Sequence, residues 1–257
     1  MRQSQPVDLQ VWVGELFLGS EKMPMSVVFD TSSDWLAVED KSCDTCLDAP
    51  YEAAASATAL QINPAQVSRN IANAQVTVTE WSDTVCLTES QCIDDFGFYL
   101  IEEQTGIKEP VDGYLGLARV EPFLTGSLQD ISYKRGPSFM SALVQNGLIS
   151  QNIFSLEIGQ GNGDKFIHFG APLEDKMKDP EKITYISLME DLFWATNCQG
   201  IAFDSLDNSY RFPNIESEFV RNNQVYSIFD SESSRIVLPE FLFPSFVETI
   251  FKEAGGS

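Results

Sequence analysis

The sequence has little of what several classes of enzyme and binding protein require. It has a single histidine, His168, in 257 residues, so only this residue could serve as the histidine base of a catalytic triad. Lysine and arginine number 16 against 38 aspartates and glutamates, and the net charge is −22. Nucleic acids are bound by clustered basic side chains, so this chain is not expected to bind a nucleic acid.

Long apolar runs are missing as well. A membrane span needs about 20 apolar residues, and no run of that length occurs, so no membrane span is expected. The first ten residues place no apolar stretch behind Arg2, and they are not expected to be a signal peptide. No Asn-x-Ser/Thr acceptor for N-glycosylation occurs. One sign of secretion is therefore missing, but its absence does not argue against secretion.

Strand-like segments outnumber helical ones, and this predicts a large all-β protein with mainly antiparallel strands and a few short helices. Helices are expected at Pro137–Gly147 and Pro239–Ile250, whereas Ala53–Leu60 fits a helix or a loop. Gly159–Gly163 is interpreted as a hairpin loop. Val11–Leu18 and Met25–Phe29 are expected to form a hairpin that turns at Gly19–Lys22. The other expected strands are Ala74–Thr79, Phe96–Ile101, Phe154–Ile158, Phe166–Phe169, Tyr185–Leu188 and Phe193–Ile201.

Composition places a linker late in the chain. The stretch Pro172–Lys182 is charged and contains proline, which favours a connection between two lobes. The expected domains are an N-terminal lobe at 1–171, the linker at 172–182 and a partial C-terminal lobe at 183–257.

Five cysteines fall as two close pairs and a single residue, Cys198. Two short disulfide loops, Cys43 with Cys46 and Cys86 with Cys92, are the favoured interpretation and imply an oxidising compartment. A redox pair at Cys43 and Cys46 would lack a surrounding βαβ pattern, and a zinc site would lack further ligands. Cys198 is interpreted as a buried thiol or as a cysteine that pairs outside this chain.

Two segments 200 residues apart are nearly the same. Val27–Ser33 reads VVFDTSS and Ser227–Ser233 reads SIFDSES, each an apolar strand end followed by Asp, a hydroxyl residue, a variable residue and Ser. Two such loops can bring Asp30 and Asp230 together. Two carboxylates in contact keep one proton between them, so that one activates water while the other polarises a peptide carbonyl.

Further segments in the same order carry a family resemblance. They are Val27–Val38, Val111–Ala118, Pro137–Ile158 and Phe193–Trp194, followed by the second Asp loop. The chain resembles the pepsin-like (A1) family of aspartic endopeptidases from about residue 11 onward. The resemblance implies a bilobal acid protease fold with an incomplete second lobe, and it places Cys43 and Cys46 in that family's first small disulfide loop.

The same resemblance implies roles for the two loops. Asp30 and Asp230 would be the catalytic pair. Thr31 and Ser231 would brace the loops against each other, while Ser33 and Ser233 would hydrogen-bond the carboxylates from outside. Val111–Ala118 would thread beside the first catalytic loop, and no cofactor or metal is implied.

Three departures from the family pattern oppose efficient catalysis. Ser32 and Glu232 stand where the family has glycine, and Glu232 adds a third carboxylate beside the pair. The expected flap at Asn70–Gln75 has neither Tyr nor Gly, and the second lobe lacks an apolar-apolar-Gly element.

These observations predict a catalytically impaired pseudo-protease that uses the groove between the lobes, or an open sheet edge, for peptide binding or assembly. The alternative is an active endopeptidase working at acidic pH through Asp30 and Asp230. A third hypothesis is a structural subunit whose second lobe a partner protein completes. The expected location is the secretory pathway, outside the cell or in an acidic vacuole.

Overall fold

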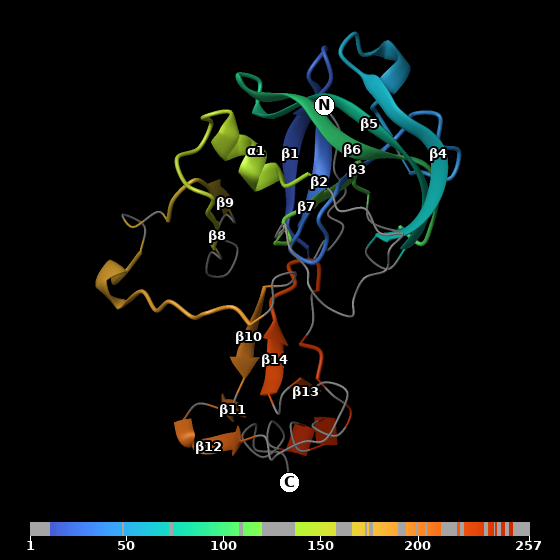
Figure 1. The fold of residues 1–257 in the computed structure, drawn as a ribbon. Helices are drawn as coiled ribbons and strands as arrows, with labels where there is room; N and C mark the ends of the chain where they lie inside the picture. Colours follow the sequence, from blue (N-terminus) through green and yellow to red (C-terminus); the bar gives the residue numbers. More distant parts are fainter. Residues whose placement is uncertain are drawn as a thin grey trace.

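The computed structural model describes residues 11–47, 49–71, 74–107, 110–119, 137–157, 166–172, 174, 177–189, 194–198, 200–203, 205–211, 220–221, 224–233, 236–238, 240, 243–244 and 247–248. They form a larger N-terminal unit, β1 to β9 with helix α1, and a smaller C-terminal unit, β10 to β14, drawn above and below in Figure 1. Strands predominate, so the predicted all-β class is confirmed. Within the described residues, no helix is long and apolar enough to cross a membrane.

A seven-stranded sheet forms the N-terminal unit, in the order β1-β2-β7-β3-β6-β5-β4, and β1 also pairs with β5. Its β2 and β7 are parallel, whereas β7 runs antiparallel to β3. The strands are β1 Val13–Leu18, β2 Met23–Asp30, β3 Leu36–Glu39, β4 Leu60–Ile71, β5 Ala74–Thr88, β6 Gln91–Thr105 and β7 Gly113–Gly116.

The hairpin predicted at the start of the chain is present as β1 and β2. Its turn is made by Gly19 to Lys22, and Gly19 has φ 77°, a left-handed conformation that glycine adopts without steric cost. β2 then changes character along its length, because its first two residues are exposed while the last four, including Phe29 and Asp30, are buried. β2 therefore begins at the surface and ends in the core, where it places Asp30.

The middle strands differ from the prediction in length and number. β5 and β6 each have 15 residues, far beyond the predicted Ala74–Thr79 and Phe96–Ile101, and register shifts let them bend along the sheet. β4 has no predicted counterpart. Most of its side chains are exposed, so its sequence lacks the alternation that marks a half-buried strand.

The β4–β5 hairpin occupies the expected flap position. Ile71 pairs with Ala74 at its tip, and both side chains are buried in an apolar cluster that also contains Trp35 and Tyr99. Trp35 stacks on Tyr99 with ring centroids 3.8 Å apart. The hairpin tip is thus held by apolar packing.

Helix α1, Phe139–Gln145, confirms the first predicted helix. The Ser138 hydroxyl accepts a hydrogen bond from the Ser141 N–H at 3.2 Å, and Gly147 ends the turn with φ 68°. Phe139, Met140 and Leu143 are buried against the sheet in the larger apolar cluster. The following β8, Phe154–Glu157, and β9, Phe166–Phe169, form an antiparallel pair beside it.

The C-terminal unit contains short strands. They are β10 Ala195–Cys198, β11 Gly200–Phe203, β12 Ser205–Arg211, β13 Val220–Arg221 and β14 Gln224–Ile228. β10 and β13 both pair with β14, whereas β11 and β12 pair with each other. The strand expected around Phe193 to Ile201 is therefore divided into β10 and β11.

Several other predictions have mixed outcomes. Ala53–Ala55 is a 3-10 helix within an otherwise irregular segment, and Leu60 already belongs to β4. Pro180–Lys182, at the end of the predicted linker, is a second 3-10 helix. The Gly159–Gly163 loop lies outside the described residues, as does most of Pro239–Ile250, of which 243–244 and 247–248 are helical.

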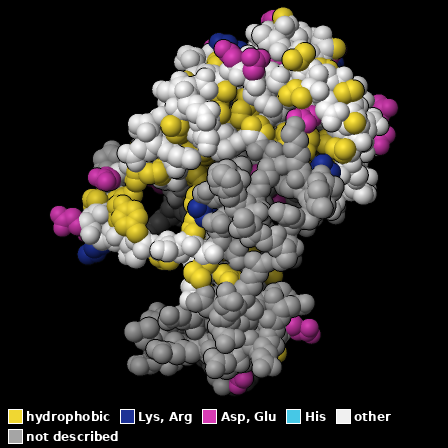
Figure 2. Space-filling view, viewed as in Figure 1, with side chains coloured by type: hydrophobic (Ala, Val, Ile, Leu, Met, Phe, Trp, Pro, Cys, Tyr) yellow, Lys and Arg dark blue, Asp and Glu magenta, His cyan; other side chains and the backbone are white. Residues whose placement is uncertain are grey.

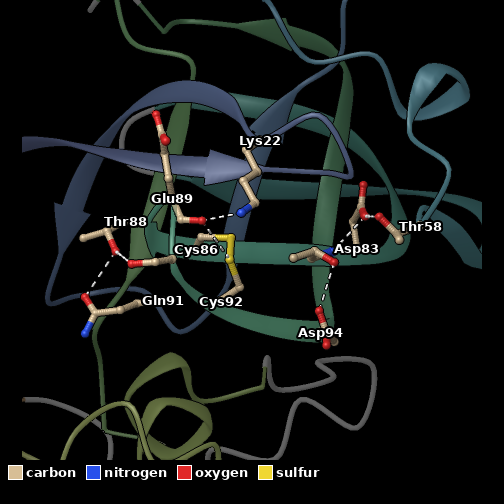
Figure 3. Close-up of a disulfide and its surroundings, with 11 residues drawn as sticks. Lys22, Thr58, Asp83, Cys86, Thr88, Glu89, Gln91, Cys92 and Asp94 are labelled. Atoms are coloured by element: carbon tan, nitrogen blue, oxygen red, sulfur yellow. Dashed lines mark hydrogen bonds between the residues drawn. A yellow bond between two sulfur atoms is a disulfide. The ribbon is translucent and has the colours of Figure 1, made fainter.

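Both predicted disulfides are present, Cys43–Cys46 and Cys86–Cys92. The second joins register partners near the β5–β6 turn, where Lys22 donates a hydrogen bond to the Glu89 carbonyl (Figure 3). Cys198 takes part in neither disulfide and is half-buried.

Candidate functional site

The two predicted aspartates stand at matching points of the two units. Asp30 is the last residue of β2, and Asp230 follows β14 by two residues. Asp30 is fully buried, whereas Asp230 is closer to solvent. In Figure 1 the lower end of β2 faces the upper end of β14, so the loops that carry both aspartates meet between the units.

A repeated backbone contact precedes each aspartate. The Phe29 N–H donates to the Trp12 carbonyl at 2.8 Å, and the Phe229 N–H donates to the Trp194 carbonyl at 2.9 Å. In both units the tryptophan immediately precedes the strand that pairs with the aspartate strand. Trp12 was not among the predicted site residues. The signal for it in the sequence was the Trp before an apolar residue, repeated as Trp12-Val13 and Trp194-Ala195.

Four hydrogen bonds join the two aspartate loops directly. The Thr31 N–H donates to the Ser231 hydroxyl at 2.9 Å, and the Ser231 N–H donates to the Thr31 hydroxyl at 2.9 Å. The Thr31 hydroxyl donates to the Phe229 carbonyl at 2.8 Å, and the Ser231 hydroxyl donates to the Phe29 carbonyl at 2.5 Å. Each hydroxyl is both donor and acceptor, so these bonds fix the two loops relative to each other.

Strand β7 holds the Asp30 loop from behind. The Leu117 N–H donates to the Asp30 carbonyl at 2.7 Å, and the Ala118 N–H donates to the Ser33 carbonyl at 2.8 Å. Gly116 is required here, because a Cβ on it would lie 2.6 Å from backbone atoms of the loop. The Trp194 indole also donates to the Leu117 carbonyl at 2.9 Å, which links this strand to the C-terminal unit.

The carboxylates accept hydrogen bonds from their own loops. Asp30 Oδ1 accepts from the Ser32 N–H at 2.7 Å and from the Ser32 hydroxyl at 2.6 Å. Asp230 Oδ1 accepts from the Glu232 N–H at 3.0 Å. Both residues that replace glycine therefore present a backbone N–H to the aspartate two positions earlier.

Ser33 differs from the role that the resemblance implied. Its hydroxyl oxygen is buried and has no hydrogen-bond partner, and the same is true of Asp30 Oδ2. The hydroxyl that bonds the Asp30 carboxylate is that of Ser32, one residue earlier in the loop, and it bonds Oδ1. For Ser233, the backbone N–H donates to the Asp230 carbonyl at 3.3 Å, and the role of its side chain stays a prediction.

A third carboxylate joins the pair. Asp30, Asp230 and Glu232 each offer one oxygen, and these oxygens lie within 4.8 Å of one another. Two ionised carboxylates at that separation repel by on the order of 3 kcal/mol at an effective dielectric constant of about 20. Carboxylate oxygens gathered in this way are the kind of ligand that Ca²⁺ and Mg²⁺ accept.

The histidine lies apart from this cluster. His168 is on β9, where its Nε2 is 3.2 Å from a Glu157 carboxylate oxygen. His168 on β9 is therefore paired with Glu157 and is not part of the carboxylate cluster. The chemistry available between the loops is that of carboxylates, hydroxyls and backbone N–H groups.

Comparison with known proteins agrees with the geometry. The family model described as eukaryotic aspartyl protease matches residues 11–257. No curated protein matches the chain.

Proposed function

Because the chain belongs to the eukaryotic aspartyl protease family, we propose that it is a catalytically impaired member that binds extended polypeptide and hydrolyses it inefficiently or not at all. The proposed lobes are residues 1–171 and 183–257, joined by the linker at 172–182. Peptide would lie between them, across the two aspartate loops. An extended peptide bound there can pair its backbone with strand edges, which gives affinity without strict sequence requirements.

The observation that carries this proposal is the position of Glu232. Its carboxylate oxygen lies within 4.8 Å of oxygens of both Asp30 and Asp230. A working pair holds one proton and positions one water between two carboxylates. A third carboxylate adds a negative charge that must be compensated and offers a competing acceptor for that water and proton.

The hairpin tip supports the same proposal. Ile71 and Ala74 pack into an apolar cluster with Trp35. A flap in the family presents a Tyr-Gly-x-Gly tip over substrate, and the β4–β5 tip offers no hydroxyl at Ile71 or Ala74. It can cover a bound peptide by apolar contact but supplies fewer polar contacts for orienting a scissile bond.

The second candidate is an active endopeptidase at acidic pH. It is favoured by the four hydrogen bonds between the loops and by the N–H groups of Ser32 and Glu232, which donate to Asp30 and Asp230. In this candidate, Asp30 and Asp230 share a proton. The ionised carboxylate takes a proton from water as that water attacks the peptide carbonyl, and the protonated one donates to the carbonyl oxygen.

One experiment separates the candidates. A reduced and alkylated protein labelled with fluorescein serves as substrate and ligand from about pH 2.5 to 6.5, where two carboxylates can share one proton. We expect saturable binding in fluorescence anisotropy with no new peptide termini in mass spectrometry. Turnover that disappears in Asp30→Asn would establish the second candidate, and absence of both binding and turnover would overturn the first.

An oxidising compartment is part of the proposal. The disulfides Cys43–Cys46 and Cys86–Cys92 support it, because such bonds persist outside the reducing cytosol. We therefore propose the secretory pathway, the exterior of the cell or an acidic vacuole as the location.

A further inference from the structure

The carboxylate cluster between the two units has one member that lies entirely out of solvent. Asp30 is 0% exposed, whereas Asp230 and Glu232 lie nearer the surface. A buried carboxylate loses its hydration, and this loss must be compensated by hydrogen bonds or by an opposite charge. The surroundings of each Asp30 oxygen therefore decide what else the cluster can bind.

The two oxygens of Asp30 differ in their partners. Oδ1 accepts hydrogen bonds from the N–H and the hydroxyl of Ser32, at 2.7 and 2.6 Å. Oδ2 is buried and accepts no hydrogen bond from any described residue. The Ser33 hydroxyl, in the same loop, is a second buried oxygen without a hydrogen bond to the described part of the chain. A buried carboxylate oxygen without a donor, in a cluster with two further carboxylates, is a suitable ligand for a cation.

Neutral contacts set the spacing of the three carboxylates. Thr31 and Ser231 exchange hydrogen bonds and so join the two aspartate loops. The Glu232 N–H donates to Asp230 Oδ1 at 3.0 Å, which fixes the backbone of Glu232 beside that aspartate. The cluster is thus assembled before an ion binds, so ion binding requires little reordering of the loops.

The size of the cluster favours Ca²⁺ over Mg²⁺. One oxygen from each of Asp30, Asp230 and Glu232 lies within 4.8 Å of the other two. Two oxygens bound to one ion are at most twice the metal–oxygen distance apart, which is about 5 Å for Ca²⁺ and about 4.2 Å for Mg²⁺. Ca²⁺ therefore tolerates the whole of this spacing, whereas Mg²⁺ needs closer oxygens in a stricter octahedral arrangement. Water on the solvent side, where Asp230 and Glu232 lie, would complete the coordination of Ca²⁺.

The charge of the chain acts in the same direction. The sequence has 38 acidic against 16 basic residues, and acidic side chains appear around the whole outline of the molecule in Figure 2. Such a surface raises the local concentration of cations. Three ionised carboxylates in the cluster carry three negative charges, of which one Ca²⁺ neutralises two.

We propose that Asp30, Asp230 and Glu232 bind one Ca²⁺ ion between the two aspartate loops. The proposal deepens the proposed function and rests on its account of Glu232 as a third carboxylate beside the pair. The ion takes the place in which a working pair holds its proton and water. It also joins the two units, because its carboxylate ligands come from both of them.

The test measures Ca²⁺ binding with no peptide present. The full chain is freed of metal with EDTA and titrated with CaCl₂ near pH 7 by isothermal titration calorimetry, in about 0.15 M NaCl to screen the acidic surface. We expect one saturable site with Kd below about 1 mM, the weak limit for extracellular Ca²⁺ modules. The midpoint of thermal unfolding should rise by about 5 °C when Ca²⁺ is present at about 100 times its Kd.

Three variants locate the site. Glu232→Gln keeps the size of a half-buried side chain and removes one ligand charge, so it should bind Ca²⁺ at least about tenfold more weakly. Asp230→Asn removes a second ligand charge and should weaken binding to a similar extent, so the test does not depend on one variant folding. Glu181→Gln is the matched control, since Glu181 is exposed in the second 3-10 helix and outside the cluster, and it should bind like the parent chain.

Four results would overturn the proposal: no saturable site, unchanged affinity in folded Glu232→Gln or Asp230→Asn, equal weakening in Glu181→Gln, or equal affinity for Mg²⁺ in the same titration. Failure of this proposal and failure of the proposed function are distinguishable. Ca²⁺ binding without binding of the labelled unfolded protein would overturn the peptide-binding role and leave the ion site in place. Binding of that protein without a Ca²⁺ site would do the reverse.

Discussion

Thr31 and Ser231 exchange hydrogen bonds across the two units, since the backbone N–H of each donates at 2.9 Å to the hydroxyl of the other. The two residues are 200 positions apart, and each follows its aspartate directly. The reciprocity fixes both distance and orientation of the loops. The aspartates are thereby positioned by neutral groups, and no ion pair is needed to bring them together.

Replacing Thr31 tests this arrangement. Thr31→Val removes the donor to the Phe229 carbonyl and the acceptor for the Ser231 N–H while keeping the shape of the side chain. We expect the free energy of unfolding to fall by about 2–3 kcal/mol, as two hydrogen bonds are lost and their partners remain between the units. Urea unfolding followed by tryptophan fluorescence measures this. Thr31→Ser retains the hydroxyl and should stay within about 1 kcal/mol of the parent; equal losses in both variants would contradict the bonding role.

Glu232 is the residue whose removal should restore catalysis most directly. In Glu232→Gly the third carboxylate is lost and the backbone N–H that donates to Asp230 is kept. We expect kcat/KM for a reduced and alkylated protein near pH 4 to rise at least about tenfold, equivalent to about 1.4 kcal/mol of transition-state stabilisation. Glu232→Gln removes the charge but keeps a side chain of similar size. Comparing it with Glu232→Gly therefore separates the effect of the negative charge from that of steric crowding. If Glu232→Gly, with its fold intact, leaves turnover unchanged, the carboxylate is not what limits activity.

Gly116 should tolerate no side chain. The Cβ of Gly116→Ala would lie 2.6 Å from the Ser33 carbonyl oxygen and from backbone atoms of Asp34 and Trp35, so strand or loop must move. We expect about 3 kcal/mol of lost stability, which is large for one methyl group. Gly97→Ala is the control, because its Cβ would meet nothing nearer than 3.5 Å. Thermal unfolding of both variants measures the difference, and a similar stability would show that the loop can shift at little cost.

Sequence patterns predicted best those parts of the fold that local chemistry determines. The β1–β2 hairpin and helix α1 follow from residue types at fixed spacing, whereas the position of Val111–Ala118 beside the Asp30 loop was implied by the family resemblance. β4 escaped prediction because it is an edge strand with mostly exposed side chains, which leaves no alternation to detect.

The site shows the same division. The aspartate loops were predicted from a repeated motif, and the bracing role of their hydroxyls was implied by the family resemblance, but neither predicted that the Ser32 hydroxyl would bond Asp30. Which hydroxyl bonds Asp30 depends on the side-chain rotamers in the folded loop, and a pattern of residue types in the sequence does not determine these rotamers.

Tyr51 should control the stability of the N-terminal unit at alkaline pH. Its hydroxyl donates at 2.7 Å to the buried carboxylate of Asp83, which also accepts from the Thr58 hydroxyl (Figure 3). Burial, and then the hydrogen bond to Asp83, raise the pKa of Tyr51 above its ordinary value of 10.0. The unfolded chain therefore loses this proton at lower pH than the folded protein does, so the stabilisation is complete below about pH 10 and is lost as the pH rises further.

Tyr51→Phe tests both parts of this argument. At pH 7 the variant should lose about 1.5–3 kcal/mol of unfolding free energy, because the buried Asp83 side chain loses one hydrogen-bond donor. Between about pH 9 and 11 its stability should fall less steeply than that of the parent, since one tyrosine no longer contributes to the linkage. Urea unfolding at each pH gives both quantities. Tyr185→Phe, at a tyrosine 85% exposed, should match the parent throughout. A Tyr51→Phe curve parallel to the parent's above pH 10 would mean that Tyr51 ionises equally easily in the folded and unfolded chain.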